Sequence, residues 1–441
     1  MSFRLLTGVA ALALMAAPGA SRADEAELRE VRNEIARMRQ DYESRIRDLE
    51  GRLAQTEAAA GQATATASDA KKAAEEAARP PAASASGFNP SIGVVMNGTA
   101  TAAHRDPAGY AVPGFALGSD AKPLDRGFAL GESEINLSAN IDHVLYGALT
   151  VSYARDNTVS VEEGFIQSTG LPWGFTVKGG RFKSGVGYLN EQHAHTWDFA
   201  DAPLPYRVML NNQYGDDGAQ VRWLAPTEMF VELGAEAFRG DSFPANGAAN
   251  KGVGANSAFA HVGDDIGAGG EGGSWRAGVS ELWTRTSGRT TGSDTFSGAD
   301  RLTIVDGTYK WAPDGNFAER YVKLQGEYFY LQESGRFNFL RDATTQQGFY
   351  AQAVWQFMPQ WRLGGRYDRV WADAVNAEQT GGTLDSLGRV GHRESVMVDY
   401  STSEFGRFRL QGNLDRSTAK TDPQLILQYT VSLGAHGAHA Y

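Results

Sequence analysis

The chain has 441 residues, a formal net charge of -11, 42% hydrophobic residues and no cysteine. The missing cysteines exclude disulfides, thiolate metal sites and a lipoprotein anchor, and the acidic balance argues against a nucleic-acid partner. Mean hydropathy is -0.37, and no run of about 18 apolar residues occurs beyond the N-terminus, so no transmembrane helix is expected there.

Residues 1–23 are expected to be a signal peptide that is removed on secretion. Arg4 supplies the positive start, residues 5–17 form the apolar stretch, and Ser21-Arg22-Ala23 precedes a cut at Asp24. The apolar run is too short for a membrane anchor. The mature protein is therefore expected outside the cytoplasm.

Residues 24–57 are expected to form a periplasmic coiled-coil helix. The apolar residues of this segment are spaced 3-4-3-4-4-3-4, which is a heptad seam with one stutter; they are Leu28, Val31, Ile35, Met38, Tyr42, Ile46, Leu49 and Leu53. Such a stripe needs a partner, so we expect a homo-oligomer assembled through this helix, with packing on its own barrel as the alternative. Residues 58–87, rich in Ala and ending near Pro80-Pro81, are expected to be a linker.

Residues 88–441 are predicted to be an outer-membrane β-barrel, because apolar and polar residues alternate with a period of two. The last strand is the clearest case, with Leu425, Leu427 and Tyr429 on one face and Gln424 and Gln428 on the other. Abundant Gly and 10% aromatic residues fit hairpin turns and aromatic girdles. The fold class predicted is an all-β, antiparallel transmembrane barrel.

We expect 16 strands, with 14 or 18 as alternatives, since barrels of this kind have an even number. Short turns at Asp156-Asn157 and Met358-Pro359 are expected to alternate with long polar loops; the loops are 105–127, 184–216, 239–271, 285–300 and 373–390. Glu281 falls on the lipid side of its strand. A bulge or an early strand end is expected there.

Charged residues in the inward phase of the strands are expected to line a water-filled lumen. The predicted pore-lining residues split by sign along the chain: the acidic ones are Glu132, Glu134, Glu228, Glu232 and Glu236, and the basic ones are Lys178, Arg222, Arg362, Arg366, Arg407 and Arg409. The alternative is that these charges pair with one another and fill a plugged interior.

The segment around residues 185–217 is expected to fold into the barrel as a constriction loop, because it is too apolar to lie in solvent. The residues that mark it are Tyr188, Asn190, Glu191, His193, His195, Trp197, Asp198 and Asp201. A packed extracellular cap is the alternative.

His193 and His195 have the ligand type of a divalent metal site, together with Glu191, Asp198 and Asp201. His436 and His439 near the C-terminus add two further candidates. A hydrogen-bonded loop histidine is the simpler interpretation, so a metal site stays an alternative and no cofactor is expected. No catalytic motif appears, and we expect no enzyme activity.

Several stretches resemble one proteobacterial outer-membrane family. They are residues 178–199, which contain Gln192-His-Ala-His-Thr-Trp-Asp-Phe199, residues 212–226, residues 88–93 and the Gly-Ala-His-Gly-Ala-His ending. Members of this family are labelled zinc-regulated TonB-dependent outer membrane receptors, and the resemblance implies metal-linked uptake. A short coiled coil before a medium-sized barrel also resembles phosphate-selective-type porins.

The function expected from the residues is a porin-like channel for passive or weakly selective passage of small solutes or ions. The alternatives are a TonB-linked receptor for zinc or a metal complex, and a structural tether of the outer membrane. About 350 residues leave no separate plug, whereas receptors of that class have 22 strands and a plugged lumen. Expected partners are outer-membrane lipid and lipopolysaccharide, the barrel insertion machinery and further copies of the chain.

Overall fold

The computed structural model describes residues 90–153, 158–246, 252–266, 272–313 and 315–434, together with Arg37, Gln40, Glu43 and Ser44, which are helical and exposed. The chain divides into two compact units, Met1–Phe88 and Asn89–Tyr441. The predicted signal peptide, coiled-coil seam and linker lie outside the described residues, as do the Asp156-Asn157 turn, His436 and His439.

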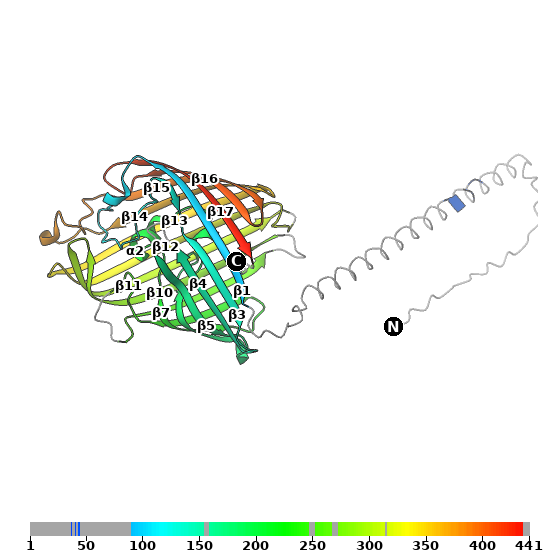
Figure 1. The fold of residues 1–441 in the computed structure, drawn as a ribbon, viewed down its shortest axis with the longest axis horizontal. Coiled ribbons are helices and arrows are strands. Elements are labelled where there is room, and N and C mark those ends of the chain that lie inside the picture. The colour runs from blue at the N-terminus through cyan, green and yellow to red at the C-terminus, as the bar shows by residue number, and fades with distance from the viewer. Residues whose placement is uncertain are drawn as a thin grey trace, which may run out of the picture. The chain divides into compact units, whose positions relative to one another are not determined.

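The second unit is a closed antiparallel β-barrel (Figure 1). Its strands are β1 (Ser91–Ala103), β2 (Gly127–Leu130), β3 (Ser133–Asn140), β4 (Leu145–Tyr153), β5 (Val159–Ser168), β6 (Phe175–Lys183), β7 (Gly215–Leu224), β8 (Phe230–Phe238), β9 (Ala255–Ile266), β10 (Gly272–Thr291), β11 (Asp294–Ala312), β12 (Tyr321–Phe337), β13 (Leu340–Met358), β14 (Trp361–Ala372), β15 (Gly391–Ser403), β16 (Gly406–Asp415) and β17 (Asp422–Gly434). Strand β1 pairs with β17 and closes the ring.

The ring has 16 positions because β2 and β3 share one of them. Both strands pair with β1, β2 through Gly98↔Leu130 and β3 through Val95↔Glu134. Gly131 and Glu132 interrupt the ladder between the two segments. The predicted fold class and the predicted number of 16 strands are therefore confirmed.

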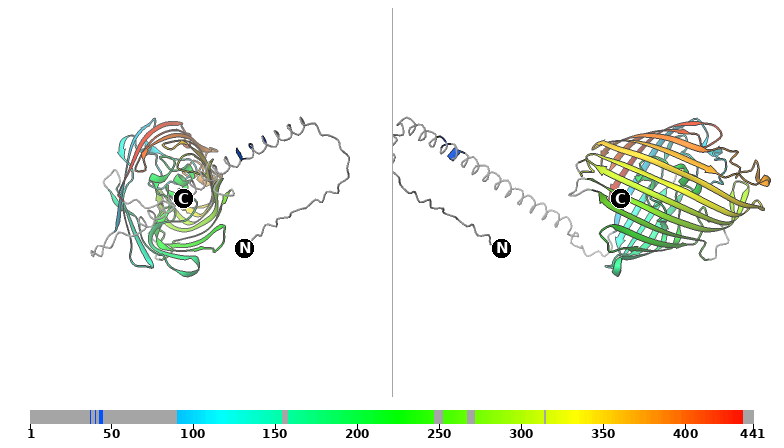
Figure 2. Two further views of the ribbon diagram at one scale, coloured as in Figure 1. Left: turned by 90° about the vertical axis from the view of Figure 1, so that its right-hand side faces the viewer. Right: turned by 180° about the vertical axis from the view of Figure 1, so that it is seen from behind.

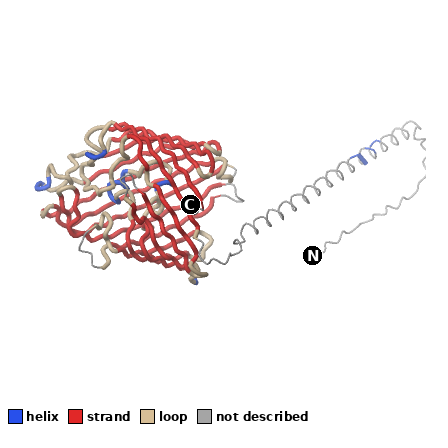
Figure 3. Tube along the Cα trace, in the orientation of Figure 1, coloured by secondary structure: helices blue, strands red, loops and turns tan. Residues whose placement is uncertain are grey.

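Apolar side chains point outward and polar ones inward, as the alternation predicted. On β17, Leu425 and Leu427 are about half exposed, whereas Gln424 and Gln428 are buried. Figure 3 shows strands wrapping the whole barrel, with loops gathered at its ends. In the part of the chain that the structure describes, no helix is both long and apolar enough to cross a membrane.

Strands β10 to β13 are much longer than a bilayer requires, and this overturns two predicted loops. Strand β10 has 20 residues, or about 65 Å at ~3.3 Å per residue, against an outward apolar band of about 25 Å. The segment 285–300 is the far end of the β10–β11 hairpin, and 239–271 contains β9. The prediction for 285–300 failed because strand ends beyond the apolar band have no lipid-facing side, so apolar and polar residues do not alternate there. In β9 the alternation is weak, because Phe259 faces inward and Asn256 and Asp264 face outward.

Glu281 faces outward but needs no bulge. Its strand pairs regularly with β11 at Glu281↔Thr303, and the register shift on β10 comes later, between Ser287 and Arg289. The Glu281 carboxylate forms an ion pair with Arg301 of β11. The expected bulge was therefore wrong, because a cross-strand partner compensates the charge.

Candidate functional site

The segment that joins β6 to β7, residues 184–214, runs inside the barrel, and we call it the lumen loop. It contains a 3-10 turn, Ala194–Thr196, and the helix α2, Leu204–Leu210, whose residues are all buried. Helix α2 packs on β13 and β14. The view along the barrel in Figure 2 (left) shows chain within the ring of strands. The apolar residues that made this segment unsuited to solvent pack against inward-facing Leu282, Ile304, Phe329 and Val370.

Three polar side chains fix the ends of the lumen loop. Asn190 joins its two ends, because its amide donates to the carbonyls of Ser184 and Tyr214 and its oxygen accepts from the Tyr214 N–H at 2.7 Å. Glu236 of β8 accepts from Ser184 and from the Gly185 N–H. Glu327 of β12 accepts from the N–H groups of Tyr188 and Leu189 and from the hydroxyl of Tyr206.

On one side the lumen loop meets five arginines of β14 to β16, which we call the arginine side: Arg362, Arg366, Arg393, Arg407 and Arg409. Asp201 of the loop receives Arg366 at 2.7 Å and Arg393 at 2.7 Å, and it also pairs with Arg207 of α2 at 3.3 Å. The amide groups of Gln411 and Asn413 bond to the same carboxylate. Asp201 is therefore a fully paired buried charge.

Asp198 extends this network toward the other end of the barrel. It pairs with Lys323 at 3.0 Å and with Arg362 at 3.1 Å, while Arg362 and Arg409 share Asp399. Burial alone raises the pKa of each loop carboxylate, but the neighbouring cations outweigh it and lower the pKa of Asp198 and Asp201 below the usual range. Both carboxylates therefore stay ionised at neutral pH.

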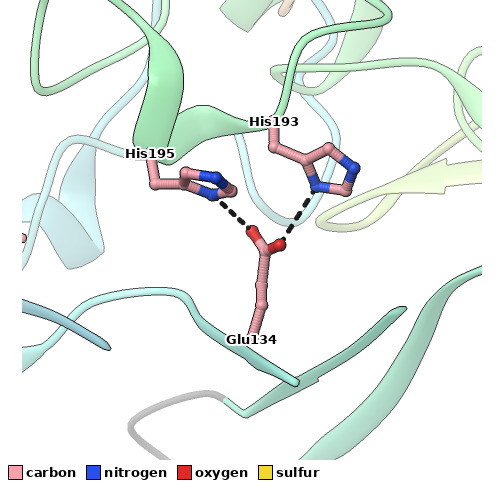
Figure 4. Close-up of side chains that lie close together, drawn as sticks. All are labelled: Glu134, His193 and His195. Atoms are coloured by element: carbon pink, nitrogen blue, oxygen red, sulfur yellow. Dashed lines mark hydrogen bonds and ion pairs between the residues drawn. The ribbon is translucent and has the colours of Figure 1, made fainter. Parts of the chain in front are cut away.

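On the opposite side the lumen loop meets carboxylates. Glu134 of β3 lies between two loop histidines (Figure 4), with His195 Nδ1 at 3.0 Å from Oε1 and His193 Nδ1 at 3.2 Å from Oε2. The Nε2 of His193 contacts Glu163 at 2.9 Å. Burial and the Lys183 ammonium lower the pKa of His193, but the three nearby glutamates prevail and raise that pKa well above 6.5. This region therefore attracts positive charge.

A β-bulge on β5 places two consecutive carboxylates in the lumen. The register shifts between Thr150 and Val151, so Glu163 pairs with Thr150 and Glu162 has no opposite residue. Bulges of this kind redirect a side chain. Glu132, Glu134, Glu162 and Glu163 together form what we call the carboxylate cluster, and Lys183 is bonded to Glu162 at 2.5 Å. Sequence reasoning named neither Glu162 nor Glu163, and a strict alternation places only one of two neighbours in the lumen.

The lumen loop separates two cavities. The cavity near the chain ends of the barrel has a volume of about 1010 Å³, and its basic lining residues are Lys310, Lys323, Arg362 and Arg407. The cavity at the long-loop end has about 710 Å³, and its acidic lining residues are Asp120, Glu132, Glu162, Asp201, Asp216 and Asp241. The loop residues His195 and Asp198 line the first cavity, and Trp197 and Asp201 line the second.

The other residues predicted for the pore lie in three settings. Arg222 bonds to Glu191 of the loop and to Glu232, and the Lys178 ammonium lies 4.6 Å from the centre of the Phe165 ring. Glu236 holds the loop, as described above. Glu228 does not fit the prediction, because it is exposed in the turn between β7 and β8 and precedes the first residue of β8.

Three further buried charges belong to the site and were not predicted: Lys183, Glu327 and Arg393. Arg393 is fully buried and holds both Asp201 and Asp368. It lies in the inward phase of β15, opposite in phase to Val396 and Val398. The alternation of β15 was therefore the signal that would have identified it.

Comparison with known proteins gives one sequence relative and a set of similar folds. No protein-family model matches the chain. An uncharacterized protein of Aquifex aeolicus (strain VF5) is 31% identical over 344 residues, which cover 72% of this chain and 70% of that protein.

Solved structures share the fold at low sequence identity. A loop L8 deletion mutant of OmpT, an outer membrane protein of Vibrio cholerae, has a TM-score of 0.51 at 10% identity and covers 78% of this chain and 99% of its own. The outer membrane channel DcaP of Acinetobacter baumannii has a TM-score of 0.50 at 12% identity, covering 79% and 99%. None of these relatives carries the TonB-dependent receptor label that the sequence resemblance suggested.

Proposed function

This chain belongs to the family of the uncharacterized Aquifex aeolicus protein, and we propose that it is a porin-like channel of the bacterial outer membrane. A closed barrel with an apolar outer face is suited to a lipid bilayer. The cargo is proposed to be small solutes or ions that pass passively or with weak selectivity. A barrel with a plugged, inert interior is the competing interpretation.

The observation that carries this proposal is the position of the lumen loop between two polar cavities. A membrane anchor or tether needs no such spaces, since its interior can be filled by side chains alone. Cavities of about 1010 and 710 Å³ on either side of the loop are large enough for hydrated ions. The loop is then the constriction that separates an outer from a periplasmic vestibule.

The charges predict a preference for anions at the periplasmic vestibule. Among the described residues, no carboxylate lies within ion-pair distance of the Arg407 guanidinium, which donates to the backbone carbonyl of His195 at 2.6 Å. Fixed positive charge on the wall of a narrow pore raises the local concentration of anions. Arg407 therefore lines this cavity with a positive charge that no ion pair among the described residues offsets.

The direct test is the conductance of the purified, folded barrel in a planar bilayer. The chain has no cysteine, so a single introduced cysteine reports on one position. Thr196→Cys faces the periplasmic cavity and Ala200→Cys faces the outer one. We expect steps of channel conductance, and a charged thiol reagent should reduce the conductance of both variants.

A matched control is Leu427→Cys, which points outward from β17 and should give no change with the same reagent. Replacing residues 191–202 with a short Gly-Ser linker should raise the single-channel conductance. A folded barrel without conductance, before and after this replacement, would contradict the channel.

A receptor for a metal or metal complex is the second candidate, favoured by the paired histidines on the carboxylate cluster. Receptors of the TonB-linked class have 22 strands and a plugged lumen; here the barrel has 16 positions and its own loop occupies the lumen. Uptake of radioactive zinc that requires cellular energy would favour the receptor. Energy-independent solute passage favours the channel.

We also propose that the chain assembles with further copies through residues 24–57, and that it meets lipopolysaccharide and the insertion machinery in the outer membrane. One similar structure, OmpT of Vibrio cholerae, is described as a trimer form. Deletion of residues 25–57 should leave a folded barrel with weaker oligomers. Chemical cross-linking of the deletion variant measures this.

A further inference from the structure

The strongest unexplained feature is the meeting of the lumen loop with the carboxylate cluster. Three glutamates, Glu134, Glu162 and Glu163, contact His193 or His195 next to a single lysine, Lys183, and Glu132 is exposed at the edge of the cluster. Buried like charges are costly unless a cation compensates them. The arginine side has no excess of carboxylates, because Asp198, Asp201 and Asp399 each pair with at least two cations.

Three polar atoms in this cluster face one another without a hydrogen bond. They are Glu134 Oε2, Glu162 Oε2 and His193 Nδ1, all buried. His193 Nδ1 lies 3.2 Å from the Glu134 oxygen and 3.7 Å from the Glu162 oxygen. Ligand atoms of a tetrahedral zinc ion with bonds of about 2.1 Å are roughly 3.4 Å apart, so these separations fit one shared cation.

The fourth ligand is His195. The ligand atoms of Glu134, His193 and His195 all lie within 4.8 Å of one another, and so do those of Glu132, Glu134 and Glu162. Figure 4 shows both imidazole rings turned toward the Glu134 carboxylate. The His-x-His spacing across the 3-10 turn places the two rings 5.6 Å apart.

The surrounding contacts orient these ligands as metal sites require. His193 presents Nδ1 to the cluster while its Nε2 contacts Glu163 at 2.9 Å, and Glu163 is itself held by the Lys183 N–H at 3.1 Å. A carboxylate behind a ligating histidine fixes the ring and its tautomer. Lys183 binds the other oxygen of Glu162 and leaves Oε2 directed at His193.

We propose that His193, His195, Glu134 and Glu162 form a binding site for one first-row divalent transition-metal cation, with Zn²⁺ as the fitting example. Two imidazoles and two carboxylates suit such ions, whereas Ca²⁺ and Mg²⁺ prefer oxygen ligands alone. The ion joins the lumen loop to β3 and β5. The binding itself is independent of channel activity.

The test is equilibrium binding of Zn²⁺ to the folded full-length chain in detergent, at neutral pH. His436 and His439 are first replaced by alanine, because a histidine-rich tail binds zinc by itself. We expect one Zn²⁺ per chain, displacement by Co²⁺ with a visible d–d absorption spectrum, and no competition from excess Ca²⁺ or Mg²⁺.

His193→Gln and Glu134→Gln should each weaken binding by at least tenfold. The matched control is His261→Gln, since His261 contacts one carboxylate, Glu232, at 2.9 Å and stacks on Phe259. That variant should bind zinc as the parent does. A heat-modifiable band in gel electrophoresis checks that each variant is folded.

Two results would overturn the proposal. One is the absence of Zn²⁺ binding in the folded parent with the tail histidines replaced, which would leave a proton on His193 as the compensating charge. The other is equal binding by the His193, Glu134 and His261 variants. The parent measurement decides the question even if a variant fails to fold.

Discussion

The two sides of the lumen loop are held by opposite chemistry. On the arginine side, loop aspartates meet wall arginines, and Asp201 alone has three cationic partners, Arg207, Arg366 and Arg393. On the other side, loop histidines meet a wall of glutamates that outnumbers the nearby cations. On the arginine side, Asp201 already has protein cations as partners, whereas on the other side the proposed metal ion would supply the missing positive charge.

The largest effect is expected for Asp201→Asn. The change keeps the shape but removes the charge. Arg366 and Arg393 keep one shared carboxylate, Asp368, whereas buried Arg207 loses the carboxylate of its ion pair. Breaking a buried ion pair in this way costs roughly 3–5 kcal/mol. We expect release of the loop, seen as a lower unfolding temperature and noisier, larger conductance steps.

The control for this variant is Asp241→Asn, whose ion pair with Arg239 is largely exposed. It should unfold at the same temperature as the parent does. An Asp201→Asn barrel with unchanged stability and conductance would show that the arginine side does not hold the loop.

A smaller effect is expected for Arg409→Gln, and a different one for Arg407→Gln. Arg409 is buried and bonds to both oxygens of Asp399, so its loss should cost about 1.5–3 kcal/mol, the value of hydrogen bonds to charged groups. Arg407→Gln should spare stability and shift the reversal potential in a salt gradient toward cations. The assignment would be wrong if Arg407→Gln lowered the stability and Arg409→Gln changed only the reversal potential.

Glu134→Gln should have a still smaller effect on the metal-free protein. The Gln oxygen still accepts from His195, and the remaining glutamates keep their contacts with His193. We expect the free energy of unfolding to change by less than about 1 kcal/mol, measured by urea titration with a chelator present. A loss as large as that of Asp201→Asn would remove the distinction between the two sides.

The smallest effect is expected when the pH is lowered from 7 to 5: the contacts of the lumen loop with the arginine side should be unchanged. Because the pKa values of Asp198 and Asp201 are lowered in the folded protein, their contribution is present above the unfolded value of about 3.9 and is lost only as pH falls through the folded values. Thiol labelling of an Ala200→Cys variant at both pH values measures this, with each rate divided by that of the unfolded variant at the same pH, because only the thiolate reacts. Faster labelling at pH 5 would contradict it.

The sequence by itself determined the barrel and the inward side of most strands, and it favoured 16 strand positions over 14 or 18. The reason is local. In a strand that separates lipid from water, side chains alternate between the two sides, so an apolar residue marks the lipid side and a polar residue the lumen side. It also indicated the lumen loop, since Trp197 and Phe199 needed a wall to pack on. The rule failed where strands leave the lipid, as in 285–300.

Only the tertiary structure decided which charges meet. Asp201 and Arg393 lie 192 residues apart and Glu134 and His195 lie 61 residues apart, and their contact depends on strand order, stagger and the path of the loop. The bulge that turns Glu162 into the lumen is likewise a property of the β4–β5 pairing and breaks the period that the sequence shows. Contacts across a closed barrel join residues that are distant in the sequence, so no single segment of the sequence predicts them.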